Sequence, residues 1–413
     1  MSRGTESVFS GCANNANPGA SLGNGQDPPV AAAKRRRTPV GPQHVAMSDA
    51  PHALPTSASD SAGGDGFADR LLVWFDHSGR HDLPWQHPRT PYRVWLSEVM
   101  LQQTQVATAA PYFVRFVDAL PSLPALAAAP LDDVLALWSG LGYYSRARNL
   151  QATAQRCMAI HGGELPRELD ALMALPGIGR STAAAILAQA WGERFAILDG
   201  NVKRVLSRYH GVAGWPGMPA IENRLWQLAQ CHLPRQRLQD YTQAQMDLGA
   251  TVCTRSNPAC PRCPLQDGCV ARMQGRVAEL PTRKARKPIP QRHAHVLWME
   301  NDHGCVLLQR RPPAGIWASL WTLPQTDDID AASLWFQAHV HGDFSSAQLL
   351  ASIAHAFSHY KLALLPLRWR GVTAREHVRD NPDLRWVPRD QLTRLGIPAP
   401  IRTLLGQPSP ATE

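Results

Sequence analysis

Four of the eight cysteines lie in one short loop, where their spacing allows them to hold a metal centre. The stretch CTRSNPACPRCPLQDGC separates consecutive cysteines by six, two and five residues, at Cys253, Cys260, Cys263 and Cys269. Four thiolates so placed can close around a zinc ion or an iron–sulfur cluster. Zinc ribbons usually carry two separate Cys-x-x-Cys pairs and this loop has one, so the spacing favours a cluster and leaves zinc as the alternative.

A single carboxylate, Glu98, lies in an otherwise apolar run, VWLSEVMLQQTQV, at residues 94–106. A surface helix would place its charge on a polar stripe. Within four residues on either side, Glu98 instead meets Val94, Trp95, Val99, Leu101 and Gln102. This placement indicates that Glu98 is a functional carboxylate and not a solvent-exposed surface charge.

The stretch ALMALPGIGRSTAAAILAQAW predicts two helices joined by a tight turn. The first helix is expected to end at Leu175, the turn to contain Gly177 and Gly179, and an alanine-rich helix to begin at Arg180 or Ser181. Backbone amides at the start of a helix can hold a phosphate without reading base sequence. A plain helical hairpin is the alternative, and the formal net charge of +9 favours the phosphate.

The segment FAILDGNVKRVLSRY predicts an apolar stretch followed by a helix for which Asp199 is a suitable N-cap. Capping alone would explain this aspartate. However, Lys203 and Arg204 occupy the first turn, where the helix dipole disfavours cations. Their placement indicates that the start of this helix faces an anion.

Composition divides the 413 residues into four segments. Residues 1–66 are rich in Ala, Pro, Gly, Ser and Asn and are expected to be a disordered tail. Helical periodicity extends over residues 67–278, which predicts an all-helical domain that includes the cysteine loop, residues 253–269. A basic, proline-bearing linker is expected at 279–290. Alternating patterns in HAHVLWME, GCVLLQRR and LALLPLRWRGV predict a mixed α/β domain over 291–405.

The excess of basic residues favours an anionic partner, and nucleic acid is the leading candidate. No apolar stretch approaches the roughly 18 residues of a membrane-spanning helix. The N-terminus also lacks the pattern of a secretory signal. KRRR at residues 34–37 is either a nuclear address, a nucleic-acid patch or a solvated charge run. We therefore expect a soluble intracellular protein.

Together these stretches resemble one family closely, the helix-hairpin-helix DNA glycosylases with a Gly/Pro-rich loop and an aspartate, and among them the MutY family of adenine DNA glycosylases. The match is dense from Phe67 to Cys269 and looser in the C-terminal third. The matching motifs are LPW at 83–85, VWLSEVMLQQTQV at 94–106, GLGYYSRARNL at 140–150, LPGIGRSTA at 175–183, LDGNVKRV at 198–205, the cysteine loop and FSH at 357–359.

The resemblance implies removal of a base that has been flipped out of the duplex. Glu98 would be the general acid, with a pKa raised by its apolar neighbours. Asp199 would stabilise positive charge on the sugar, and Asn201 would orient the carboxylates or the attacking water. Gln102 would insert into the duplex. Lys203 and the hairpin, with Gly177, Gly179 and Ser181, would contact the DNA backbone, and the four cysteines would hold a 4Fe-4S cluster.

The resemblance also implies how the opposite base is read. Tyr143 would wedge beside an 8-oxoguanine, although an ordinary half-buried tyrosine is the alternative. Phe357 would wedge, Ser358 would bond the atoms that distinguish 8-oxoguanine from guanine, and His359 would pair with phosphate. The C-terminal domain resembles the Nudix fold, but QTDDIDAASLWFQAH lacks the glutamates that hold magnesium in Nudix hydrolases. We expect a lesion-reading domain without hydrolase activity.

Two other functions remain open from the sequence. Endonuclease III-type enzymes remove oxidised pyrimidines and place a lysine nucleophile where this chain has Ser181. A catalytically inactive DNA-binding module is the other alternative. The expectation is therefore a monomeric, monofunctional glycosylase of base excision repair that acts on adenine opposite 8-oxoguanine or guanine, associated with DNA and located in the cytoplasm or nucleoid if the source is bacterial.

Overall fold

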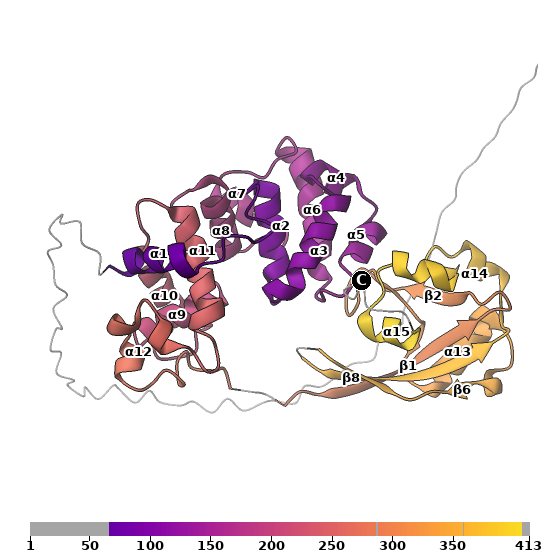
Figure 1. The fold of residues 1–413 in the computed structure, drawn as a ribbon. Helices are drawn as coiled ribbons and strands as arrows, with labels where there is room; N and C mark the ends of the chain where they lie inside the picture. The colour runs from indigo at the N-terminus through magenta and orange to yellow at the C-terminus, as the bar shows by residue number, and fades with distance from the viewer. Residues whose placement is uncertain (1–65, 286–287, 358, 407–413) are drawn as a thin grey trace, which may run out of the picture. The chain divides into compact units, whose positions relative to one another are not determined.

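The computed structural model describes residues 66–285, 288–357 and 359–406 (Figure 1). The predicted N-terminal tail up to residue 65, with its KRRR motif, and Ser358 lie outside the described residues. Within those ranges, no helix is long and apolar enough to cross a membrane.

Twelve α-helices and no strand occur between residues 66 and 285, as the helical periodicity predicts. They are α1 (Phe67–Ser78), α2 (Pro91–Leu101), α3 (Val106–Ala119), α4 (Leu123–Ala128), α5 (Leu131–Leu137), α6 (Ser145–Ile160), α7 (Leu169–Met173), α8 (Arg180–Trp191), α9 (Gly200–Tyr209), α10 (Pro219–Cys231), α11 (Leu238–Asp247) and α12 (Val270–Met273). A π-helical turn, η1 (Leu248–Val252), follows α11, and two short 3-10 turns, η2 (Cys260–Arg262) and η3 (Gln266–Gly268), lie in the cysteine loop.

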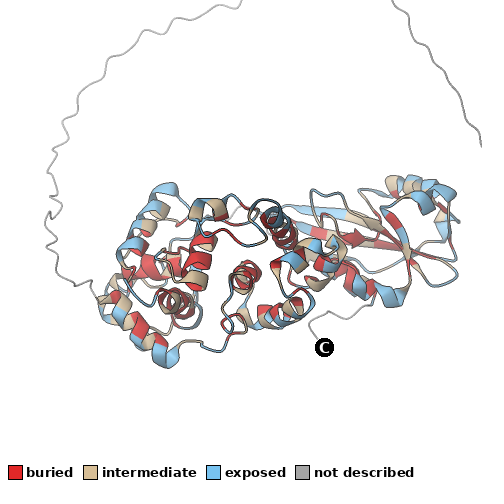
Figure 2. Ribbon diagram, turned by 90° about the horizontal axis from the view of Figure 1, so that it is seen from above, coloured by how far each residue is buried: buried red, intermediate tan, exposed pale blue. Residues whose placement is uncertain are grey.

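The helices build two hydrophobic cores that share α8. One core collects buried side chains from α2 to α8, and the other collects those of α1 and α8 to α11. Figure 2 shows the buried residues on the inward faces of these helices. In α8, Ile186 and Leu187 belong to the first core, whereas Ala184 and Ala185 belong to the second. Alanines allow the two sides to approach α8 closely, so residues from α2, α9 and α11 can meet beside it.

Local interactions fix both ends of α2, the helix that carries Glu98. Thr90 caps its start by accepting a hydrogen bond from the Arg93 amide, and Pro91 occupies the first turn. At its other end, the buried Arg146 guanidinium donates to the carbonyls of Val99 and Met100 over 3.0 and 2.8 Å. A cation at the C-terminus of a helix complements the helix dipole. The end of α2 is therefore held in place next to Gln102, the residue predicted to insert into the duplex.

The C-terminal domain is built around one mixed sheet. Its strands are β1 (Gln291–Glu300), β2 (Val306–Arg310), β3 (Trp321–Thr322), β4 (Gln325–Thr326), β6 (Gln348–Leu349), β7 (Ile353–Ala356), β8 (Lys361–Arg370) and β10 (Leu384–Val387), while β5 (Val340–His341) and β9 (Thr373–Ala374) pair separately. Its helices are α13 (Ile329–His339), α14 (Glu376–Asp380) and α15 (Ala399–Leu404), with 3-10 turns η4 (Phe344–Ser346) and η5 (Arg389–Arg394).

The pairing of β1 differs from that of a simple hairpin. It meets β2 in antiparallel register at Glu300 and Val306, as the turn between them predicts. Its long partner is β8, which runs parallel to it from Gln291 beside Lys361 to Glu300 beside Arg370. Alternate β1 residues enter cores on opposite faces of the sheet, where α13 and α15 also contribute. Periodicity predicted the strands, but a parallel partner so distant in the sequence leaves no local signal.

Candidate active site

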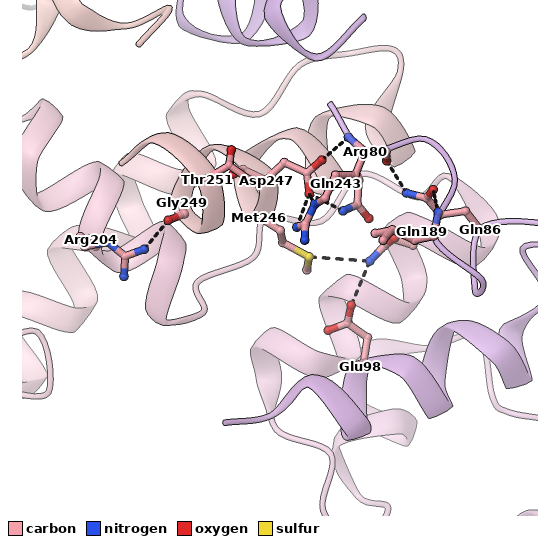
Figure 3. A network of polar contacts seen from close by, with 11 residues as sticks. Arg80, Gln86, Glu98, Gln189, Arg204, Gln243, Met246, Asp247, Gly249 and Thr251 are labelled. Carbon is pink, nitrogen blue, oxygen red and sulfur yellow. Dashed lines mark hydrogen bonds and ion pairs between the residues drawn. The ribbon is translucent and has the colours of Figure 1, made fainter. Parts of the chain in front are cut away.

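Glu98 projects from α2 into a cavity of the helical domain. Gln189 of α8 donates a hydrogen bond from Nε2 to Glu98 Oε1 over 2.9 Å (Figure 3). Burial and, to a lesser extent, the nearby Asp199 raise the pKa of Glu98 from 4.5 to about 8, and the Gln189 hydrogen bond opposes that rise. The expectation of a raised pKa is confirmed. The structure also shows a neighbour that the sequence reasoning missed, Gln189.

Asp199 is the N-cap of α9, as predicted. Its side chain accepts a hydrogen bond from the Val202 amide over 2.7 Å. Burial raises the pKa of Asp199, while that amide and the positive charge of Arg204 act in the opposite direction. Because Asp199 also raises the pKa of Glu98, the two carboxyls are coupled, and the second of them to ionise does so against the charge of the first.

One cavity of about 590 Å³ brings together four of the predicted residues from separate parts of the chain. Glu98 and Gln102 come from α2 and its end, and Asp199 and Asn201 from the start of α9. Its volume lies in the ordinary range for small-molecule sites. Residues to which the sequence analysis assigned no individual role also line the cavity, among them Arg80, Leu83, Trp85, Thr182, Gln243, Met246 and Thr251.

A partly buried ion pair supports one side of this cavity. Asp247 is fully buried at the end of α11 and accepts hydrogen bonds from the backbone amide and the guanidinium of Arg80 over 2.7 and 2.5 Å. Gln243 donates to the same carboxylate over 2.7 Å (Figure 3). The carboxylate is therefore fully engaged, and it orients Arg80 and Gln243, both of which line the cavity. The signal in the sequence was a set of polar residues, QAQMD, inside an otherwise buried helix.

Arg204 connects the cavity to the cysteine loop. Its guanidinium donates to Asn201 Oδ1 over 2.8 Å, to the Gly249 carbonyl over 2.7 Å and to the Cys253 carbonyl over 2.7 Å. The sequence predicted that Arg204 faces an anion, but these three acceptors belong to the protein. Arg204 therefore orients Asn201 instead of projecting freely.

The four cysteines of the loop line one small apolar cavity together with Arg208. Arg208 is buried, and its Nη1 lies 3.3 Å from Cys253 Sγ. Among the described residues, no three His, Cys, Asp or Glu side chains are close enough to hold a single metal ion. The loop therefore places its four thiols around one shared apolar space.

The predicted hairpin lies between α7 and α8. Helix α7 ends at Met173, two residues before the expected end, because Leu175 already belongs to the turn. Gly177 has φ +77°, and a Cβ there would lie 2.8 Å from the Asn149 side chain, so the turn requires glycine. Gly179, at φ −90°, does not. Ser181 Oγ accepts from the Leu198 amide over 3.0 Å, and so ties α8 to the segment before Asp199.

The remaining predicted DNA-contacting residues lie away from the catalytic cavity. Lys203 pairs with Glu222 over 2.7 Å and lines a neighbouring groove. Tyr143 is half exposed, with φ +47°. Phe357 follows β7 and packs against Trp317 and Tyr360 with ring centroids 5.7 and 4.9 Å apart, and His359 is exposed.

A basic groove of about 1300 Å³ adjoins the catalytic cavity, and Asp199 and Asn201 line both. Part of the predicted linker forms its wall: Leu280 accepts a hydrogen bond from Arg208, and Lys284 lies 4.7 Å from the Trp215 ring centroid. Within the described part of the chain, its basic lining residues are Lys203, Arg204, Arg208, Arg255, Arg283 and Lys284, against Asp199 as the sole acidic one. Such a groove suits a polyanion.

Comparison with known proteins agrees with this arrangement. Residues 96–231 match the HhH-GPD superfamily of base excision DNA repair proteins, and residues 295–407 match a NUDIX domain. The adenine DNA glycosylase of Buchnera aphidicola is 35% identical over 339 residues, which cover 82% of this chain and 96% of that protein. The adenine DNA glycosylase of Rattus norvegicus is 35% identical, with 79% of this chain and 72% of that protein covered.

Among solved structures, a thermostable thymine-DNA glycosylase is 27% identical, covers 51% of this chain and 96% of its own, and superimposes with a TM-score of 0.47. The two family matches confirm the expected order of a helix-hairpin-helix glycosylase domain followed by a Nudix-like domain. The relatives extend along most of the chain at about one-third identity. The chain belongs to the adenine DNA glycosylase family.

Proposed function

We propose that the protein is a monofunctional adenine DNA glycosylase that hydrolyses the N-glycosidic bond of adenine opposite 8-oxoguanine or guanine in duplex DNA. The observation that carries the proposal is the carboxyl pair in one cavity, where Glu98 has a pKa of about 8 and Asp199 caps α9. Glu98 keeps its proton at neutral pH, while the hydrogen bonding at the start of α9 favours the ionised form of Asp199, so the pair can act as acid and as anion.

Glu98 is the general acid. With a pKa of about 8 it carries its proton at neutral pH, and a base rotated into the cavity receives that proton on a ring nitrogen. Adenine N7 is the acceptor in this proposal. Protonation makes the base a better leaving group, since the electrons of the breaking C–N bond then neutralise a cation.

Asp199 stabilises the sugar as the bond breaks. Departure of the base leaves positive charge at the anomeric carbon, and a carboxylate in the low dielectric of the cavity stabilises such charge strongly. Burial raises the pKa of Asp199, and the capping hydrogen bond from Val202 and the charge of Arg204 oppose that rise and so favour the ionised form before the reaction. Asn201, held by Arg204, orients the carboxylates or the attacking water.

The cavity favours hydrolysis over strand cleavage. A glycosylase that also cleaves DNA uses an amine to form a Schiff base with the sugar. Among the described residues, no lysine lines the catalytic cavity; in the adjoining groove, Lys203 is paired with Glu222 and Lys284 lies against the Trp215 ring. Water is therefore the nucleophile, and the strand stays intact at the abasic site.

A 4Fe-4S cluster held by Cys253, Cys260, Cys263 and Cys269 completes the helical domain in this proposal. The shared apolar cavity and the spacing of the four cysteines, with six, two and five residues between them, support it. The cluster would cross-link a loop that Arg204 and Arg208 already fasten to α9. When bound, the cluster would hold the loop in place and with it Arg255, which lines the basic groove.

The protein acts as a monomer on duplex DNA. Backbone amides of the hairpin at Gly177 and Gly179 and the basic groove bind phosphates, while Gln102, which lines the cavity, fills the space left by the flipped base. Tyr143, Phe357, Ser358 and His359 read the opposite 8-oxoguanine. Helix α13 contains no glutamate, so the Nudix-like domain does not hydrolyse nucleotides.

An opposite-base panel tests the proposal. Labelled duplexes carry adenine opposite 8-oxoguanine, guanine or thymine, and excision is measured under single turnover. We expect excision opposite the first two bases only, and loss of turnover with retained binding in Glu98→Gln, which keeps the shape but lacks the acid. Binding without excision by the wild-type protein would instead identify an inactive DNA-binding module.

A further inference from the structure

Gln189 is a buried amide in an otherwise apolar stretch of α8. The residues around it in the sequence are Ala185, Ile186, Leu187 and Ala188, all buried, and Gln189 itself is 3% exposed. Burying an amide costs free energy unless it is hydrogen-bonded. A partner that offsets this cost is therefore expected, and packing alone would be served better by leucine.

That partner is Glu98. Gln189 Nε2 lies 2.9 Å from Glu98 Oε1, and its contact with the weak acceptor Met246 Sδ is longer, at 4.0 Å. Gln239 of α11 donates to the backbone carbonyl of Gln189 over 2.9 Å and so holds the last turn of α8. Figure 3 shows the Gln189 amide between Glu98 and Met246, with Nε2 directed at the carboxyl.

We propose that Gln189 is a positioning residue of the excision reaction, which keeps the acidic proton on Glu98 Oε2 and stabilises the carboxylate formed when that proton leaves. This inference rests on the proposed function. An amide N–H can only donate, so Oε1 must accept, and the proton of the neutral carboxyl is confined to Oε2. Gln189 therefore selects which oxygen delivers the proton.

The same hydrogen bond strengthens during the reaction. The proton moves from Oε2 to the ring nitrogen of the base, and the electrons of the O–H bond remain on the carboxylate. Hydrogen bonds to an ionised acceptor are roughly twice as strong as neutral ones. An interaction that strengthens as charge develops lowers the barrier, whereas uniform binding does not.

Several charged groups surround Glu98. Asp199 approaches from α9, and Arg80 and Asp247 pair with each other beside Gln243. On the α6 side, Arg146 is directed to the carbonyls at the end of α2. Of these, Asp199 raises the pKa of Glu98, while the Gln189 hydrogen bond lowers it. Removal of the donor should therefore raise that pKa further.

The test is Gln189→Met, which keeps the length and loses the donor. Excision of adenine opposite 8-oxoguanine is measured under single turnover from pH 5 to 10. Under these conditions the rate constant does not depend on the fraction of the protein that is active. We expect the alkaline limb of the profile to move up by about one pH unit. On the plateau, the rate should fall on the order of tenfold with unchanged DNA affinity.

Gln239→Met is the matched control. It removes the hydrogen bond to the backbone carbonyl of Gln189 and leaves the hydrogen bond between Gln189 and Glu98. It should keep the wild-type alkaline limb. A wild-type profile and rate in Gln189→Met would overturn the inference and leave the proposed function standing. So would equal slowing of both variants without a shift of the limb, which would indicate packing. Absence of excision by the wild-type protein would instead refute the proposed function itself.

Discussion

Glu98→Gln should make the protein more stable while it removes the activity. The folded pKa of about 8 means that the carboxyl binds its proton more tightly in the folded chain than in the unfolded one, where the value is 4.5. An acid with a raised folded pKa leaves stability unaffected below the unfolded pKa, lowers it progressively as pH rises from the unfolded to the folded value, and lowers it by a constant amount above that. The substituted amide carries no such charge and still offers an oxygen to Gln189.

The magnitude follows from the two pKa values. At pH 7 the wild-type protein should be less stable than Glu98→Gln by about 3 kcal/mol, rising to about 5 kcal/mol above pH 8. These are upper estimates, because water in the cavity softens the burial of charge. At pH 4.5 the difference should nearly vanish.

Urea unfolding followed by far-ultraviolet circular dichroism measures this difference at pH 4.5, 7 and 8.5. Glu164→Gln, at an exposed position of the same domain, is the matched control and should show no such growth with pH. A Glu98→Gln difference that stays constant from pH 4.5 to 8.5 would refute the reasoning, because it would mean that the carboxyl has an ordinary pKa in the folded protein.

Three further predictions follow from contacts around the cavity. Arg204→Met removes the donor shared by Asn201, Gly249 and Cys253. Single-turnover excision should slow at least tenfold, and the free energy of unfolding in urea should fall by about 1 to 3 kcal/mol. Lys284→Gln should reduce the slope of log affinity against log salt by about 0.9 in titrations of an uncleaved duplex; an unchanged slope would place the DNA elsewhere. Cys263→Ser should lower bound iron and sulfide and the visible absorption of the purified protein, and retention of a full complement would exclude this cysteine as a ligand.

Features encoded by adjacent residues were predictable from the sequence. The N-cap Asp199, the start of α8 and the apolar surroundings of Glu98 depend on residues within a few positions of one another. The spacing of the cysteines likewise belongs to a single loop. For these, local conformational preferences and packing act in the same direction.

The groups that support the carboxyls were not predictable in the same way. Gln189 meets Glu98 across 91 positions, and Arg80 meets Asp247 across 167. Such pairs exist only once α2, α8 and α11 have packed, and periodicity shows which face of a helix is buried but not what it faces. The available signal was polarity inside buried helices, in AILAQAW and QAQMD, because an amide or carboxylate there requires a partner.

Parallel pairing in the C-terminal sheet was hidden for a similar reason. Strands β1 and β8 both show alternation, but their register joins residues 70 positions apart, and nothing local distinguishes a parallel partner from an antiparallel one.

The most direct test of the central claim is to identify the products formed from a duplex with adenine opposite 8-oxoguanine. Mass spectrometry follows both the released base and the labelled strand, with and without alkali, and a thymine glycol duplex is run in parallel. The account predicts free adenine, an abasic strand that breaks only in alkali, no borohydride-trapped adduct, and no reaction at thymine glycol. Strand breaks without alkali, together with a trapped adduct or excision of thymine glycol, would contradict it.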